Sequence, residues 1–144
     1  APKSRDTAPE SAPNGIVYLS GPMSGYPEFN YPAFNEAAND LRAIGYQVFN
    51  PAENPIDVDS GLYSTPNNSA WVQYLKRDII ALMDCNSIAV LPGWHESKGA
   101  ALEVFIAMAL GYRVFMADSL NPLSSNNCVY AAMALFYSHK KPPL

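Results

Sequence analysis

Clustered positive charge is missing from this chain of 144 residues. Nine Lys and Arg are scattered along the sequence against 13 Asp and Glu, and the formal net charge is −4. A protein that binds polymeric nucleic acid needs grouped basic side chains to neutralise phosphates. The charge pattern therefore argues against a nucleic-acid partner and leaves small metabolites open as ligands.

Cysteine and histidine are also scarce. The only cysteines are Cys85 and Cys128, which form no CxxC pair, and the only histidines are His95 and His139. Disulfide frameworks and metal sites are built from larger and closer sets of these residues. We therefore predict two buried thiols in a reducing cytoplasm, with no metal and no cofactor.

Long apolar runs are lacking as well, since no stretch reaches the ~18 residues that a membrane helix needs. Residues 1–15, APKSRDTAPESAPNG, are rich in Pro, Ala and Ser and hold no apolar segment. This composition is typical of a disordered tail rather than of a secretory signal. Residues 16–144 are long enough for one domain with its own core, and we predict no membrane partner.

Apolar strands alternate with amphipathic helices along this domain. The predicted strands are 16–20, 46–50, 86–92 and 112–116, and the predicted helices are 32–45, 69–84, 98–111 and 126–141. Strands that are nearly all apolar and are separated by helices indicate a parallel sheet covered on both faces. The expected fold is a doubly wound, flavodoxin- or Rossmann-like α/β domain with four or five strands. In its second helix, Trp71, Tyr74 or Leu75, Ile79 and Leu82 are expected to face inward.

Ligands of such sheets bind outside the carboxyl ends of the strands, at the switch point of the strand order. The loops at this edge would be 21–31, 51–68, 92–98 and 117–126. The second of them is long for a compact domain, which is typical of functional or mobile loops. We therefore expect the functional residues to come from these four loops and the elements that they join.

Two glycine-containing segments lie at this edge. YLSGPMSG (18–25) follows the first strand and permits close approach of a ligand, but it is not GxGxxG, so a dinucleotide site is weakly indicated. A Gly-Pro turn after a strand is also common in any fold. Ser97-Lys98-Gly99 opens the third predicted helix, where Ser97 is a cap, a ligand contact or both.

Two carboxylates complete the candidate chemistry. Asp78 lies in the second helix beside Arg77, and an ordinary surface ion pair is the simplest interpretation of that position. Glu103 lies among apolar residues in the third helix, on the face that carries Gly99 and Ala107. Burying an unpaired acid costs several kcal/mol, so Glu103 needs a partner or a function.

In order and spacing these residues resemble the nucleoside 2-deoxyribosyltransferase superfamily, which includes the 2′-deoxynucleoside 5′-monophosphate N-hydrolases. The resemblance covers roughly residues 16–116. It is carried by YxxG at 18–21, by Asp78 late in the second helix, and by SxGxxxE at 97–103. The resemblance implies that Glu103 is the nucleophile, which forms a glycosyl-enzyme ester with the anomeric carbon, and that Asp78 is the general acid/base.

The resemblance also implies the binding residues. Tyr18 and Gly21 would line the sugar and base pocket, and Ser97 and Gly99 would hold a 5′ hydroxyl or phosphate. Base-stacking candidates are Tyr26, Phe29, Tyr31 and Trp94. Each of them is equally consistent with packing, and for Phe29 and Tyr31 packing is favoured.

Two positions depart from the superfamily pattern. Met23-Ser24 stand where the phosphate-using hydrolases carry an arginine, for which Lys98 is a substitute. Ala131-Ala132-Met133 lack the polar residue that a neighbouring subunit often supplies. Either Asn126 or Asn127 replaces it, or the acceptor specificity differs. The implied partner is a nucleoside or nucleotide, and a homodimer or larger homo-oligomer is expected. The last predicted helix either forms its interface or completes the core.

The sequence leaves the reaction type open. A hydrolase and a transferase differ in whether water or a second base reopens the ester. A catalytically silent nucleotide-binding module of the same fold is the alternative, because a fold does not determine a function. A flavodoxin-like electron carrier is a third possibility, which would give a yellow protein.

Overall fold

The computed structural model describes residues 15–123 and Ala134. Its four strands are β1 (Ile16–Ser20), β2 (Gln47–Phe49), β3 (Ser87–Val90) and β4 (Arg113–Met116), and they form one parallel sheet in the order β2-β1-β3-β4. This arrangement confirms the predicted single α/β domain of flavodoxin- or Rossmann-like type. Residues 1–14 of the expected tail, Asn127, Cys128 and all of the last predicted helix except Ala134 lie outside the described residues.

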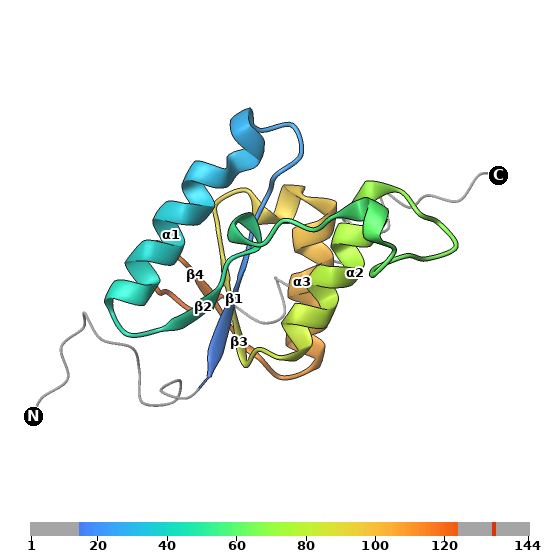
Figure 1. Cartoon of the computed structure of the whole chain (residues 1–144). Coiled ribbons are helices and arrows are strands. Elements are labelled where there is room, and N and C mark those ends of the chain that lie inside the picture. The colour runs from blue at the N-terminus through green and yellow to red at the C-terminus, as the bar shows by residue number, and fades with distance from the viewer. Residues whose placement is uncertain (1–14, 124–133, 135–144) are drawn as a thin grey trace, which may run out of the picture.

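The strand order changes direction between β1 and β3. The chain passes from β1 to β2 on one side of the sheet, then returns to β3 and continues to β4 on the other side. Tyr18 of β1 pairs with Phe49 on one side and with Ile88 on the other, and Ser20 pairs with Val90. The carboxyl ends of β1 and β3 therefore meet at the switch point, at the upper edge of the sheet in Figure 1.

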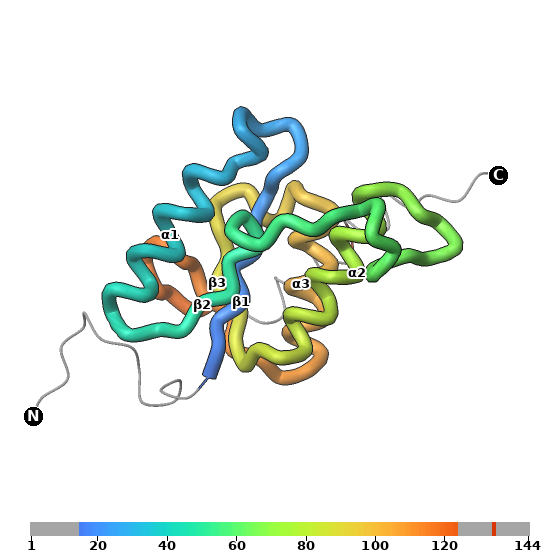
Figure 2. Tube along the Cα trace, viewed as in Figure 1, coloured from blue at the N-terminus to red at the C-terminus, as the bar shows by residue number. Residues whose placement is uncertain are grey.

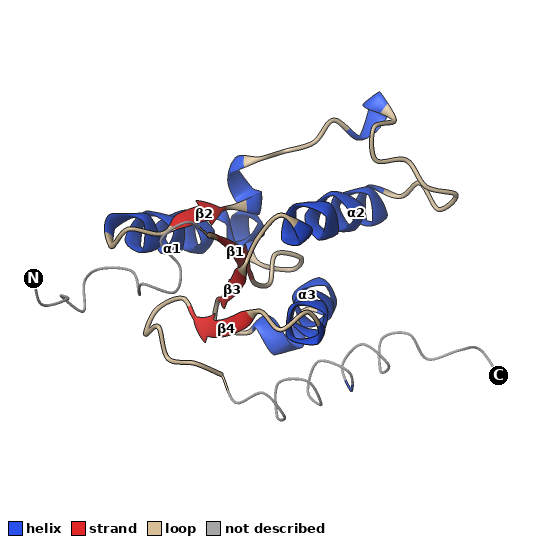
Figure 3. Cartoon of the chain, turned by 90° about the horizontal axis from the view of Figure 1, so that it is seen from below, coloured by secondary structure: helices blue, strands red, loops and turns tan. Residues whose placement is uncertain are grey.

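Helices cover both faces of the sheet. Figures 1 and 3 show α1 (Tyr31–Ala43) on one face, with α2 (Ala70–Met83) and α3 (Lys98–Ala109) on the other. Each face has its own apolar core. The α1 side holds Val17, Leu19, Phe34, Leu41 and Phe115, and the α2–α3 side holds Tyr18, Leu82, Ile88, Val104 and Val114. Alternate residues of β1 point to opposite cores, as the two-residue period of a strand requires.

Serine caps begin both helices of the second face. The Ser69 hydroxyl accepts a hydrogen bond from the backbone N–H of Val72, and the Ser97 hydroxyl accepts one from Ala100. Each cap satisfies a backbone donor that the first turn of a helix leaves free. The predicted caps, and hence the predicted starts of α2 and α3, are confirmed.

The predicted inner face of α2 is only partly correct. Leu82 is fully buried and Ile79 is half-buried, but Trp71 is 42% exposed. Trp71 lies in the first turn of α2, beside the cavity described below. Gln73 and Arg77 are the buried polar residues of this helix. The expectation failed at Trp71 because this end of α2 faces a cavity rather than the sheet.

The segment between β2 and α2 is the longest connection among the described residues, and Figure 2 shows it as a green excursion beyond α2. Two short 3₁₀ turns, Pro51–Glu53 and Val58–Ser60, interrupt it. Its first turn is anchored by the fully buried Asn50, which donates a hydrogen bond to Asn35 Oδ1 and accepts one from the backbone of Ala52.

Within the part of the chain that the structure describes, no helix has both the length and the apolar character required to cross a bilayer.

Candidate active site

A cavity of about 420 Å³ opens at the switch point of the sheet. Its walls come from the carboxyl end of β1 and the loop after it, from the first turns of α2 and α3, and from the start of α1. The residues that carry its polar and charged groups are Tyr18, Ser20, Ser24, Tyr74, Arg77, Asp78, Ser97 and Glu103. The cavity therefore lies where the topology predicts a ligand.

Glu103 is a buried acid in the wall of this cavity. Glu103 is only 6% exposed, and each of its carboxyl oxygens accepts a hydrogen bond. The Tyr18 hydroxyl donates to Oε2 at 2.8 Å, and the Ser20 hydroxyl donates to Oε1 at 2.7 Å. When Glu103 is ionised, each of these hydrogen bonds contributes about 1.5–3 kcal/mol, which offsets part of the cost of the buried charge.

Strand geometry explains why two hydroxyls meet one acid. Tyr18 and Ser20 are two residues apart on β1, so both side chains leave the same face of the sheet. That face is covered by α3, which carries Glu103. Leu19, between them, packs in the opposite core. Tyr18 is held in turn by Phe49 of β2, since the two rings stack with centroids 5.6 Å apart and an interplanar angle of 12°.

The pKa of Glu103 is raised to about 8, first by burial and then by the nearby Asp78 carboxyl. The hydrogen bonds from Ser20 and Tyr18 act in the opposite direction, because they stabilise the ionised form. The pKa of Tyr18 is also raised, mainly by burial and then by the charge of Glu103.

Stability should consequently fall as pH rises across the neutral range. In the unfolded chain Glu103 ionises near pH ~4.3. Below that pH Glu103 is protonated in both the folded and the unfolded protein, so its contribution to the free energy of unfolding is at its maximum. Between that pH and about pH 8, Glu103 is ionised only in the unfolded protein. The free energy of unfolding then decreases by up to ~1.4 kcal/mol per pH unit, and above this window the dependence ends.

Glu103→Gln removes this titration, so the variant should gain stability relative to the wild type as pH rises. Urea unfolding at about pH 5, 6.5 and 8 measures the difference. Glu36→Gln, on the exposed side of α1, is the matched control. Parallel stability curves for wild type and Glu103→Gln would show that Glu103 is not held as a buried acid.

Asp78 is the second carboxyl of the cavity. Arg77 Nε donates to its Oδ1 at 2.9 Å, and the two side chains are only 8% and 18% exposed. Burial raises the pKa of Asp78, and the hydrogen bond and charge of Arg77 lower it. The interpretation of this pair as an ordinary surface ion pair is therefore wrong.

Most of the predicted site residues meet at this cavity. Together with Glu103 and Asp78, the structure brings Tyr18, Gly21, Met23, Ser24, Ser97 and Gly99 into its lining. Lys98 lines an adjoining cavity of about 350 Å³, which shares Ser24, Trp71, Ser97 and Gly99 with the first. The Lys98 ammonium lies over the Trp71 ring, 5.0 Å from its centre, in a cation–π contact.

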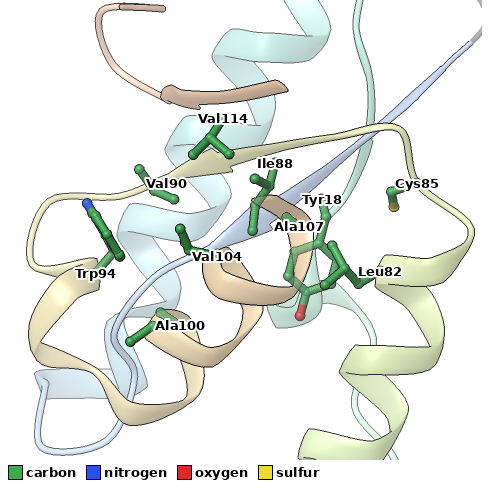
Figure 4. Close-up of a cluster of buried hydrophobic side chains, with 11 residues drawn as sticks. Tyr18, Leu82, Cys85, Ile88, Val90, Trp94, Ala100, Val104, Ala107 and Val114 are labelled. Carbon is green, nitrogen blue, oxygen red and sulfur yellow. The ribbon is translucent and has the colours of Figure 1, made fainter. Parts of the chain in front are cut away.

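Two aromatic predictions need correction. Trp94 is 7% exposed and belongs to the core cluster drawn in Figure 4, so it does not line the cavity as expected. A tight turn after Gly93, whose φ is 83°, directs Trp94 back toward the core. Phe29, for which packing was favoured, is 63% exposed and lines the cavity with Tyr31.

Sequence reasoning missed Ser20, and it missed the role of Arg77 at the cavity. The signal for Ser20 was present, because a residue two positions after Tyr18 on a strand shares its face. No comparable signal marked the contact of Arg77 with Phe49, which is distant in the sequence and whose ring lies 5.5 Å from the guanidinium carbon. Tyr74, one helical turn before Arg77, lies 5.7 Å from the same atom.

Among residues 15–123, no group of three or more His, Cys, Asp or Glu side chains is placed to hold a metal ion. Cys85 is buried, as predicted, and burial raises the pKa of its thiol to about 12, so it stays protonated.

A family model described as a domain of unknown function (DUF4406) matches residues 16–116, most of the chain. The chain belongs to the DUF4406 family. No curated protein sequence matches it significantly. The description of DUF4406 assigns no activity, so membership of the nucleoside 2-deoxyribosyltransferase superfamily stays a prediction.

Two glycines of this DUF4406 domain should respond differently to the same substitution. A Cβ at Gly21 would lie 2.8 Å from Leu91 Cβ, whereas one at Gly99 would meet no protein atom within 4 Å. Gly21→Ala should therefore lower the free energy of unfolding by ~1–3 kcal/mol. Gly99→Ala should leave it unchanged or raise it by up to ~1 kcal/mol, because alanine is the better helix former.

The extra methyl of Gly99→Ala also projects toward the cavity, so ligand affinity should fall in this stable variant. Urea unfolding and ligand titration of both variants test the pair. Equal stability losses in the two would contradict the described packing.

Proposed function

We propose that this protein cleaves or exchanges the N-glycosidic bond of a (deoxy)nucleoside or its 5′-monophosphate, through a glycosyl ester on Glu103. The observation that carries the proposal is the Glu103 carboxyl itself, buried in the wall of a cavity and oriented by the Tyr18 and Ser20 hydroxyls. A side chain whose oxygens are fixed in this way is preorganised to attack a carbon held beside it.

The first half-reaction forms the ester. An oxygen of ionised Glu103 bonds to C1′ of the sugar while the bond from C1′ to the base nitrogen breaks, and its electron pair leaves with the base. Protonated Asp78 gives its proton to the departing base. Burial raises the pKa of Asp78 and so acts toward the proton-bearing form, against the hydrogen bond and the charge of Arg77, which lower it.

The second half-reaction reverses these steps with a new nucleophile. Water or a second base attacks C1′, the ester bond breaks, and its electron pair returns to Glu103. Asp78 takes up the proton that the nucleophile releases. A hydrolase and a transferase share every residue of this scheme and differ only in the acceptor.

The cavity also suits the substrate class. Phe29, Tyr31, Trp71 and Tyr74 give it aromatic walls for a flat base. Ser97 and Gly99 stand at the start of α3, where the helix dipole favours an anionic or polar 5′ group. A cytoplasmic homodimer or larger homo-oligomer is the assembly that we propose for it.

Incubation with a panel of substrates tests the function. The panel contains the ribonucleosides and 2′-deoxynucleosides of the common bases and their 5′-monophosphates, each with and without a free acceptor base. We expect release of base from at least one member, and a new nucleoside only if the protein is a transferase. If no member loses its base, the proposed reaction is wrong.

One observation favours the second candidate, a nucleotide-binding module without catalysis. With a pKa of about 8, Glu103 is largely protonated at neutral pH, and a protonated acid donates a hydrogen bond instead of attacking carbon. A module of this kind would bind panel members, leave them intact, and bind more weakly as pH rises above 8. An enzyme would show kcat/KM rising across the same pH range.

A further inference from the structure

Arg77 is a buried arginine whose hydrogen bonds are incomplete. The residue is 7% exposed, its Nε donates to Asp78 Oδ1 at 2.9 Å, and its Nη1 donates to the backbone oxygen of Asn54. Its Nη2 is buried and has no hydrogen-bond partner among residues 15–123 and 134. An unpaired buried donor costs folding free energy, so stability alone does not explain an arginine at this position.

The surroundings of Arg77 hold its guanidinium in one place. The guanidinium carbon lies 5.5 Å from the centre of the Phe49 ring and 5.7 Å from that of Tyr74. Phe49 also stacks on Tyr18, which donates a hydrogen bond to Glu103. The planar group thus lies against two aromatic rings, one of which, Phe49, also stacks on the tyrosine that binds Glu103.

The contact to Asp78 distinguishes its two oxygens. Oδ1 accepts the Arg77 hydrogen bond, and no hydrogen bond to Oδ2 occurs within the described residues. An oxygen that accepts from a guanidinium is a poor place for a proton, because the proton would meet a positive charge. The proton of Asp78 therefore belongs on Oδ2, and Asp78 lines the cavity.

We propose that Arg77 is a positioning residue that acts through Asp78, fixing Oδ2 as the oxygen that exchanges a proton with the base. This inference rests on the proposed function. Arg77 holds the carboxyl by Oδ1 and itself touches neither the sugar nor the base. The alternative is a purely structural role, in which the hydrogen bond from Arg77 to Asn54 holds the segment after β2 against α2. The two roles predict different results when the residues are changed together.

A double-mutant cycle distinguishes the positioning role of Arg77 from its purely structural role. Arg77→Met, Asp78→Asn and the double variant are compared with the wild type for base release from those members of the panel that the wild type cleaves. We expect Arg77→Met to lower kcat by at least ~10-fold and to spare KM. The double variant should lose no more than Asp78→Asn alone, because Arg77 has no other route to the reaction. Losses that multiply in the double variant overturn the proposal.

Arg42→Met is the matched control. Arg42 also joins an acid and a backbone oxygen, with Nη1 2.8 Å from Glu53 Oε1 and Nη2 3.0 Å from the oxygen of Val48, but it does not line the cavity. Its substitution should leave kcat unchanged. Circular dichroism and urea unfolding check the fold of each variant. Should Arg77→Met fail to fold, Arg77→Lys replaces it in the cycle, since lysine keeps the charge and lacks the planar Nε contact.

A second readout is independent of turnover. The ionisation of Asp78, followed by ¹³C NMR of its carboxyl carbon, should move to higher pH in Arg77→Met, because a positive charge and a hydrogen bond are lost. An unchanged titration overturns the proposal even if activity falls. If the wild type cleaves nothing in the panel, the proposed function fails, and the catalytic part of the inference with it. If the wild type is active and the cycle is additive, only the role of Arg77 fails.

Discussion

Glu103→Gln should reduce base release by a factor of at least ~10³ without loss of the fold. The amide keeps the size of the side chain. Its oxygen can accept from one of the Tyr18 and Ser20 hydroxyls, and its NH2 group can donate to the other, because a hydroxyl both donates and accepts. It carries no charge and forms no ester that water or a base reopens, so the covalent route is closed. Steady-state kinetics on the cleaved panel members measure the loss.

The stability of Glu103→Gln shows whether its loss of base release comes from unfolding or from the missing carboxylate. Because Glu103 is a buried acid, its amide should be at least as stable as the wild type at about pH 8. A large loss of activity in a more stable protein cannot be attributed to unfolding. Glu36→Gln, on the exposed side of α1, controls for the chemical change itself. Retention of full turnover by Glu103→Gln would show that another group attacks the sugar.

Asp78→Asn should produce the second large effect, a fall in kcat of about 10²–10⁴-fold with substrate binding largely spared. The amide keeps the contact with Arg77 but cannot deliver a proton to the base. The fall should therefore shrink for deoxyribosides whose bases leave readily as anions, since these need less protonation. Comparing kcat for 2′-deoxyuridine and 5-fluoro-2′-deoxyuridine, whose base is the more acidic, measures this dependence.

Equal losses for both substrates would show that Asp78 does not protonate the leaving base. An unchanged kcat would return the residue to a purely structural ion pair with Arg77. Asp84→Asn is the matched control, because Asp84 follows α2 directly and lies outside the cavity.

Much of the fold is predictable because each element carries its own local pattern. Four apolar runs separated by amphipathic helices determine a parallel sheet, and Ser69 and Ser97 mark where two helices begin. The location of the site follows from the same pattern, because parallel strands present their carboxyl ends at one edge. Glu103 was notable in the sequence as an acid within an apolar helix, and the structure places it in the cavity wall as a buried acid.

The parts that sequence reasoning missed depend on tertiary geometry. The burial of Arg77 requires Phe49, which stands 28 positions away in the sequence and shares no pattern with it; only Tyr74, one helical turn before Arg77, is a local neighbour. The positions of the two tryptophans were wrong for a similar reason, since Trp71 was expected in the core and Trp94 at the cavity. Trp71 lies past the end of the sheet, whereas the left-handed turn at Gly93 sends Trp94 into the core. Neither turn direction nor the end of a sheet is visible in a local pattern.

The measurement that tests the central claim most directly is the mass of the intact protein after incubation with a 2′-fluorinated nucleoside. Fluorine beside the anomeric carbon destabilises the positively charged transition state, so an ester once formed is hydrolysed slowly. We predict a mass increase equal to one fluorinated sugar residue, located by peptide mapping on the peptide that contains Glu103 and missing in Glu103→Gln. Release of base with no adduct on that peptide would contradict the account.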